Sequence, residues 1–174
     1  MMRYRFSAGF TLIETLVAIG VFTMAIVAPL TAASRALQAA GVARDTLIAT
    51  NLAQEDLELA RWSRSTAYLG NLSTTNLNVG LANCIAPKAC DATYANEVNN
   101  AFMECTGGTC PPLLLNSTGF YNHTAGNTSQ FRRSMTVVVG PNGQAGVSRA
   151  TVTVTWNAHG AHSVQLFEDF YDWF

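Results

Sequence analysis

The sequence predicts an α+β fold in which one long N-terminal helix packs on a small antiparallel β-sheet. The first observation is an apolar run at residues 10–33 that contains a single ionisable residue, Glu14. The second is an amphipathic pattern that continues this run to about Arg64 without a further proline after Pro29. The third is an alternation of apolar and polar residues between 131 and 166, which is typical of strands with one buried face.

Length and composition limit what the protein can be. Its 174 residues suit one domain and an anchor. Ten Lys and Arg residues stand against eleven Asp and Glu residues, and the basic ones are scattered, so we find no convincing nucleic-acid site. No phosphate-binding glycine loop and no nucleophile motif appears. We therefore expect a protein that is not an enzyme, with no catalytic residue, cofactor or resident metal.

The apolar run at 10–33 is long enough to cross a membrane, which takes about 20 apolar residues in a helix. Arg3 and Arg5 precede the run, and the next basic residue is Arg35. The positive-inside rule then keeps the N-terminus in the cytoplasm and sends the rest of the chain outward. The sequence predicts a single-pass protein of the cytoplasmic membrane, surrounded there by inner-membrane lipid.

Glu14 is unusual because a carboxylate near the centre of a bilayer costs at least about 2.5–3.5 kcal/mol. We therefore expect a positive partner for it. The residues before the run suggest where that partner comes from. Small residues at 7–9 precede the apolar segment, whereas a secretory signal places its small-residue cleavage site after that segment. Cleavage at this site would remove the basic leader and leave the membrane segment in the mature protein.

Together, Gly9, Phe10, Glu14 and the apolar run resemble the signal of type IV prepilins and type II secretion pseudopilins. The resemblance implies cleavage after Gly9 by a prepilin peptidase and N-methylation of Phe10, the new first residue. It also implies that Glu14 is the glutamate that these families use in assembly. The family often places Lys or Arg directly before the glycine, whereas this chain has Ala8. The new amine would lie one helical turn from Glu14, so the two could pair within a subunit or between neighbours.

Residues 34–64 form the predicted amphipathic half of the helix, and Pro29 in the first half is expected to kink it locally. The acidic residues Glu55, Asp56 and Glu58 could suggest a metal or acid–base site, but a solvated helix face is the better interpretation. The apolar face is predicted to consist of Leu37, Gly41, Ile48, Ala49, Leu52, Ala53, Leu59, Ala60 and Trp62.

Residues 65–130 are rich in turn-forming residues and contain all four cysteines. Outside the cytoplasm an even number of cysteines predicts disulfides. A turn at Gly107-Gly108 would place Cys105 opposite Cys110 at a Cα separation of about 4.5 Å, which a disulfide can bridge. We favour Cys105–Cys110 with Cys84–Cys90. A nested pairing (Cys84–Cys110 with Cys90–Cys105) and a four-cysteine zinc site are the alternatives.

Three strands are predicted near the C-terminus, at 131–139, around 150–156 and from Val164, joined by turns at 141–143 and 157–160. Arg133 is the one charged residue on the apolar face of the first strand. The aromatic tail, residues 167–174, is expected to close the core against the helix rather than to bind carbohydrate. A metal site at His159, His162 and Glu168 is only weakly indicated.

These features predict a minor type IV pilin, held in the membrane, cleaved, and then assembled into or at the tip of a cell-surface filament with other pilin subunits. The first alternative is a minor pseudopilin of a type II secretion system or a DNA-uptake pseudopilus. The second is a signal-anchored surface enzyme or binding protein. The predicted segments are a leader (1–9), a membrane half (10–33) and an amphipathic half (34–64) of the helix, a disulfide-tied loop region (65–130), and a sheet with its aromatic tail (131–174).

Overall fold

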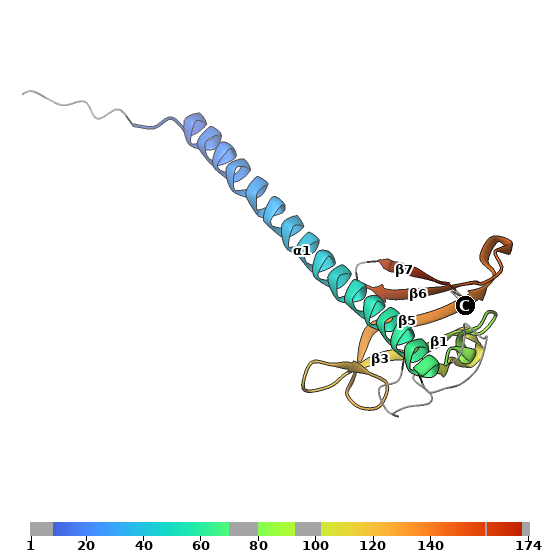
Figure 1. The fold of residues 1–174 in the computed structure, drawn as a ribbon. Helices are drawn as coiled ribbons and strands as arrows, with labels where there is room; N and C mark the ends of the chain where they lie inside the picture. The colour runs from blue at the N-terminus through green and yellow to red at the C-terminus, as the bar shows by residue number, and fades with distance from the viewer. Residues whose placement is uncertain (1–8, 70–79, 93–101, 159, 172–174) are drawn as a thin grey trace, which may run out of the picture. The chain divides into compact units, whose positions relative to one another are not determined.

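A computed structural model describes residues 9–69, 80–92, 102–158 and 160–171. The chain falls into two compact units, Met1–Ala43 and Arg44–Phe174, and each is considered by itself. One α-helix, α1 (Leu12–Leu69), contributes to both units (Figure 1). The long N-terminal helix is therefore confirmed, although it ends five residues beyond the expected Arg64. It remains helical through Pro29, and a kink there stays a prediction.

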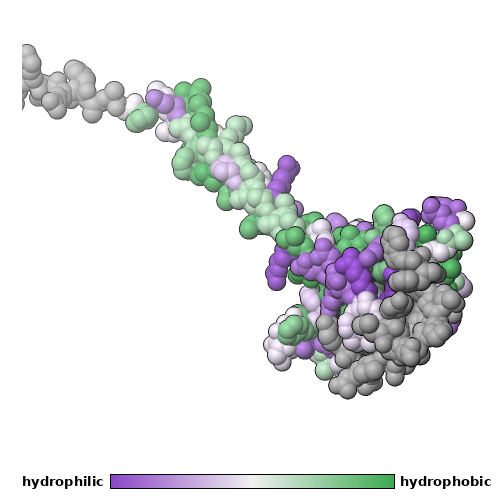
Figure 2. All heavy atoms as spheres, in the orientation of Figure 1, coloured by the Kyte–Doolittle hydropathy of each residue, from purple (hydrophilic) through white to green (hydrophobic). Residues whose placement is uncertain are grey.

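In the first unit, the residue before the helix stabilises its first turn. The Glu14 N–H donates to the backbone oxygen of Thr11 at 3.1 Å and to its Oγ1 at 3.4 Å. Such a Thr satisfies a backbone donor that would otherwise have no partner at a helix start. Among the described residues, α1 is the one helix long and apolar enough to cross a membrane, judged by length and composition. Its N-terminal part presents a largely apolar surface in Figure 2.

The second unit contains a seven-stranded sheet in which all paired strands are antiparallel. Strand β5 is central. Along one edge it pairs with β6, and along the other it pairs with β3 at Arg132 and with β1 at Met135. Strand β6 continues to β7, β1 to β2, and β3 to β4. The strands are β1 (Cys90–Ala92), β2 (Phe102–Glu104), β3 (Pro112–Leu115), β4 (Tyr121–Asn122), β5 (Asn127–Val139), β6 (Val147–Asn157) and β7 (Ala161–Tyr171).

The α+β class and the helix-on-sheet arrangement are confirmed, but the predicted number of strands is wrong. The three expected strands correspond to β5, β6 and β7, whereas β1 to β4 come from the region predicted to be loop. These four strands have two to four residues each, which is too short for an alternating pattern to stand out. They are held by pairing with longer or neighbouring strands.

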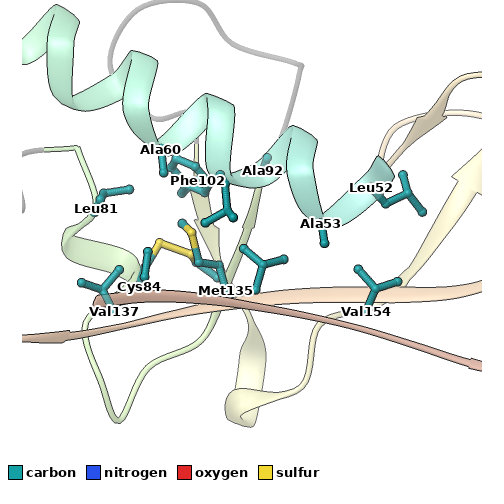
Figure 3. Close-up of a cluster of buried hydrophobic side chains, with 14 of the residues drawn as sticks. Leu52, Ala53, Ala60, Leu81, Cys84, Ala92, Phe102, Met135, Val137 and Val154 are labelled. Carbon is teal, nitrogen blue, oxygen red and sulfur yellow. A yellow bond between two sulfur atoms is a disulfide. The ribbon is translucent and has the colours of Figure 1, made fainter. Parts of the chain in front are cut away.

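The core lies between the Arg44–Leu69 part of α1 and the inner face of β5 and β6 (Figure 3). Ala53 and Ala60 are fully buried, and their small side chains let the helix approach the sheet closely. The predicted inner faces of β5 and β6 are confirmed except at Val139, which is 54% exposed. The principal core residues are Ala49, Leu52, Ala53, Leu57, Ala60, Phe131, Met135, Val137, Ala150, Val152, Val154 and Trp156.

Two predictions about large apolar side chains are wrong. Leu37 belongs to the first unit and is 75% exposed, and Trp62 on the second half of the helix is half exposed. The aromatic tail also differs, because β7 continues to Tyr171 and alternates its faces. Phe170 is buried in the core as expected, whereas Phe167 points outward and packs beneath the Arg149 guanidinium, 4.8 Å from the ring centroid. Residues 172–174 of the tail lie outside the described residues.

Candidate functional site

The first candidate site is the segment that leads into α1. Gly9 and Phe10 precede the helix, and the Phe10 side chain is 80% exposed. Apart from Gly9 and its two chain neighbours, no residue has a heavy atom within 4 Å of the position where a Cβ of residue 9 would sit. The peptide bond between them is therefore outside helical structure and open on the Gly9 side. A peptidase requires such an accessible bond, and only residues 1–9 would be removed.

Glu14 is the third residue of the helix and lies exposed in its first turn. A helix N-terminus carries partial positive charge from its free N–H groups, so it favours a carboxylate and disfavours an amine. No ion pair joins Glu14 to another residue in the part of the chain that the structure describes. Cleavage after Gly9 would create an amine four residues before Glu14. Such an amine is the expected partner for this carboxylate.

Residues 4–28 match the family model of the prokaryotic N-terminal methylation motif. The chain carries this methylation motif. The methylation motif covers residues 4–9 of the predicted leader, Phe10, Glu14 and most of the apolar run. It supports a prepilin of the type IV pilin or pseudopilin kind. It is the substrate site of prepilin peptidase. A comparison with curated proteins and with solved structures gives no match.

Two disulfides lie well beyond the methylation motif. Cys84 is bonded to Cys90 and Cys105 to Cys110, with Cα separations of 4.9 and 4.7 Å. This is the pairing favoured from the sequence, so the nested pairing and the four-cysteine zinc site are not formed. A turn with positive φ at Gly107 and Gly108 lies between Cys105 and Cys110. The segments that flank this turn do not pair as a hairpin, because β2 pairs with β1 and β3 with β5.

No cluster of three potential metal ligands occurs in the residues that the structure describes. His162 stacks on Trp156 at a centroid distance of 5.4 Å, and Glu168 is bound to Arg61 at 2.6 Å. His162 and Glu168 thus contact different residues and not each other. His159 lies outside the described residues. The weakly indicated histidine metal site has no support in this geometry.

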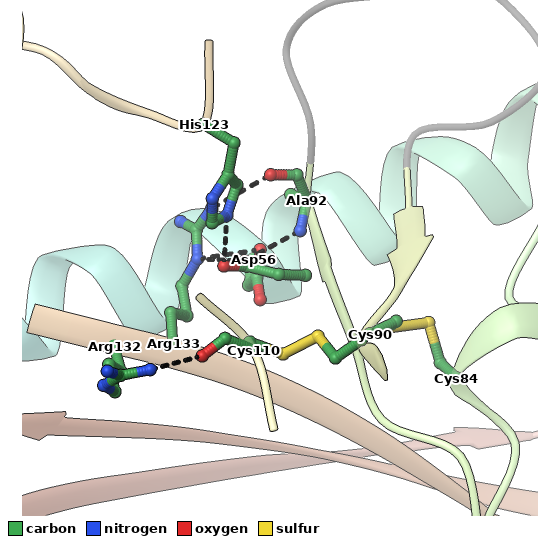
Figure 4. The surroundings of a disulfide bond; sticks show 10 residues. Asp56, Cys84, Cys90, Ala92, Cys110, His123, Arg132 and Arg133 are labelled. Carbon is green, nitrogen blue, oxygen red and sulfur yellow. Dashed lines mark hydrogen bonds and ion pairs between the residues drawn. A yellow bond between two sulfur atoms is a disulfide. The ribbon is translucent and has the colours of Figure 1, made fainter. Parts of the chain in front are cut away.

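A second candidate site is a cluster of buried charges around Arg133, which points inward from β5. The Arg133 Nε donates to the Asp91 carboxylate at 2.7 Å and lies 3.3 Å from the Asp56 carboxylate. Its Nη1 donates to Glu55 at 3.1 Å, and the His123 Nε2 lies 2.6 Å from Asp91. Asp56, Asp91 and Arg133 are at most 3% exposed. Figure 4 shows Arg133, Asp56 and His123 pointing toward one another.

The electrostatics of this cluster are unbalanced because three carboxylates share one guanidinium. Burial raises the pKa of Asp56 to about 8, and Asp91 and Glu55 act in the same direction while Arg133 opposes them. Burial also disfavours the charge of Arg133, but Asp56 and Asp91 outweigh this effect and raise its pKa. Asp91 takes the shorter contact with Arg133, so Asp56 is the carboxyl group that retains its proton at neutral pH.

The sequence pattern did not predict this cluster. Asp56 was expected on a solvated helix face, whereas it is fully buried. A signal existed, because Asp56 is four residues from both Leu52 and Ala60 and therefore lies on the apolar face. Arg133 was identified as an exception on the inner face of its strand, but the sequence did not indicate its partners. They lie 42 and 78 residues away, at Asp91 and Glu55.

Asp56→Asn is expected to reduce the loss of stability that the wild-type protein shows as the pH rises. Asp56 has a pKa of about 8 when folded and an ordinary value of 3.8, so between these values the folded state binds more protons. Its contribution to stability is complete below about pH 4 and decreases as pH rises to about 8, by at most about 1.4 kcal/mol per pH unit. Thermal unfolding of both proteins between pH 5 and 9 measures the difference. Parallel pH profiles would contradict a buried, protonated Asp56.

Proposed function

We propose that this protein is a structural subunit of a type IV filament, specifically a minor pilin. The observation that supports the proposal best is the methylation motif at the head of a helix apolar enough to span a membrane. The same helix continues into a unit where it packs on an antiparallel sheet. The protein would wait in the cytoplasmic membrane with its N-terminus inside and then enter a cell-surface filament or its tip.

The proposed mechanism is assembly rather than catalysis. Prepilin peptidase cleaves after Gly9 and methylates Phe10, and the mature amine pairs with Glu14 of the same or a neighbouring subunit. Either charge alone is costly in lipid, whereas the pair is attractive at low dielectric. The pairing therefore favours one axial register between parallel helices. The apolar side chains that α1 exposes in the first unit, from Leu12 to Leu30, supply the remaining contact surface.

A minor pseudopilin of a secretion or DNA-uptake pseudopilus is the alternative within this class, because the motif is common to both. The minor status rests on the stretch Ala53–Arg61, which resembles the segment after the membrane span in minor pilins. The abundance of this chain in purified filaments distinguishes a minor from a major subunit. A signal-anchored enzyme is less favoured because we find no catalytic constellation in the described residues.

Co-expression with an active prepilin peptidase is expected to shorten the chain by residues 1–9. Intact-mass analysis would then find Phe10 as the first residue, carrying one added methyl group. A Gly9→Val variant should remain full length, since the branched side chain occupies the residue before the cut. Replacing the adjacent Ala8 by Ser serves as the matched control and should be processed normally. A wild-type chain that stays full length with an active peptidase would exclude the pilin class.

A further inference from the structure

A groove of about 830 Å³ lies on the second unit beside the charge cluster. One side is formed by α1, through Ile48, Asn51, Leu52 and Glu55. The other side is formed by Asn116, residues 119–122, Thr124 and Ala125, and the segment 116–126 that carries them is here called the wall. Phe120 of the wall is 71% exposed, so an aromatic side chain stands open at the groove.

The wall has its own rigid local structure. The Asn122 Oδ1 accepts hydrogen bonds from the backbone N–H groups of Thr124 and Ala125, both at 2.8 Å. The loop closes at Gly126, whose φ of +133° brings the backbone so near Leu115 that a Cβ would lie 2.4 Å from its oxygen. Such a conformation requires glycine. These hydrogen bonds and the tight turn fix the local backbone conformation of the wall.

His123 attaches the wall to the core of the second unit. Its neighbours Asn122 and Thr124 line the groove, whereas the His123 side chain turns inward, is 6% exposed and contacts Asp91 at 2.6 Å. The wall has other attachments: β4 pairs with β3 through two residue pairs, and the Asn122 Nδ2 donates to the Leu114 oxygen at 3.4 Å. Tyr121 packs on the core and meets Phe131 edge to face at 5.6 Å. The position of the wall thus depends on the charge cluster beneath it.

We propose that Asp56, Asp91, Arg133 and His123 form a proton-dependent clasp that holds the wall against α1 at neutral pH and releases it at alkaline pH. The clasp concerns the folded second unit and goes beyond the proposed assembly function. It would control access to the groove, with Glu55 both lining the groove and contacting Arg133.

The charges that face His123 set the direction of the change. They are Asp91 from β1, Arg133 from β5, and Asp56 and Glu55 from α1. With a proton on Asp56, the Arg133 guanidinium faces two carboxylates, Asp91 and Glu55. Without that proton, three carboxylates share one guanidinium, and the buried excess of negative charge is costly. Moving the wall outward admits water and relieves that cost.

Tyr121 is the other titratable group on the wall, and its hydroxyl ionises at a higher pH than Asp56. Burial raises the pKa of Tyr121, with Arg44 opposing and Asp45 adding to that effect. Its hydroxyl therefore stays protonated over the range in which Asp56 titrates. The ionisation of Asp56, rather than that of Tyr121, drives the proposed release.

Hydrogen exchange of the full chain in detergent micelles tests the clasp. Exchange of peptides covering residues 116–126 is measured at about pH 6 and 9 and corrected for the intrinsic exchange rate at each pH. Protection of the wall is expected to fall by up to about tenfold per pH unit from pH 6 to the Asp56 pKa of about 8, and to change little from there to pH 9. Peptides from β5 and β6 should stay protected, because the sheet remains folded.

Asp56→Asn should keep the wall protected at pH 9, since the amide cannot ionise. His123→Ala should leave the wall unprotected at both pH values while β5 and β6 stay protected. Asp169→Asn removes a surface contact with Arg149 and should behave like the wild type. A wild-type wall whose protection does not change with pH would overturn the proposal. So would an Asp56→Asn wall that opens like the wild type, or a loss of protection that includes β5 and β6.

Discussion

Arg133→Met is expected to lower the free energy of unfolding by about 3–5 kcal/mol at neutral pH, the usual cost of removing one partner from a buried ion pair. Methionine retains part of the apolar stem of arginine but provides no charge and no donor. Asp91 would lose a hydrogen bond of 2.7 Å, and Glu55 one of 3.1 Å. The backbone oxygen of Leu52, which accepts from Arg133 at 3.2 Å, would also lose its donor.

Denaturant unfolding of the full chain in detergent, followed by circular dichroism, measures this loss. Arg132→Met is the matched control, because the adjacent arginine is exposed and donates to the backbone Cys110 oxygen at 3.0 Å rather than to a buried carboxylate. That variant is expected to lose about 1 kcal/mol. Combining Arg133→Met with Asp91→Asn should restore part of the stability, since one uncompensated charge is removed. Equal losses for the two arginine variants would show that the cluster is not a buried charge network.

Glu14→Ala is expected to leave cleavage after Gly9 intact but to reduce incorporation into filaments by at least about tenfold. A tenfold loss corresponds to about 1.4 kcal/mol per subunit, which is modest for an ion pair in an apolar environment. The reason is that the mature amine of Phe10 would be left without its carboxylate partner. The amount of this chain in sheared filaments, relative to the amount in membranes, measures incorporation.

Glu14→Gln separates charge from shape, because the amide preserves size and hydrogen bonding but not the charge. It should fail like Glu14→Ala. Thr15→Val alters the neighbouring position on the same turn, where the hydroxyl donates only to the Leu12 oxygen, and should assemble normally. Normal incorporation of Glu14→Ala, with normal cleavage, would refute the assembly role while leaving the peptidase site intact.

Much of the fold could be predicted because its signals are local. The helical period of the apolar face brought Leu52, Ala53 and Ala60 together, and these residues are buried on the sheet. The alternation in β5 and β6 correctly predicted the buried faces around Met135 and Val152. Strands β1 to β4 were not predicted because they depend on pairing with β5 or with one another rather than on a pattern of their own.

The sequence by itself determined the methylation motif, the helix and the faces of the long strands, because each depends on residues close together in the chain. The tertiary structure alone decided the partners of Arg133 and the burial of Asp56. Those contacts join α1, β1 and β5 across 42 to 78 residues, and a local pattern contains no information on such pairs. The repeat of a helix or a strand in the sequence can place a charged residue on a buried face. Only the packed helix and sheet bring together the opposite charges that allow it to stay there.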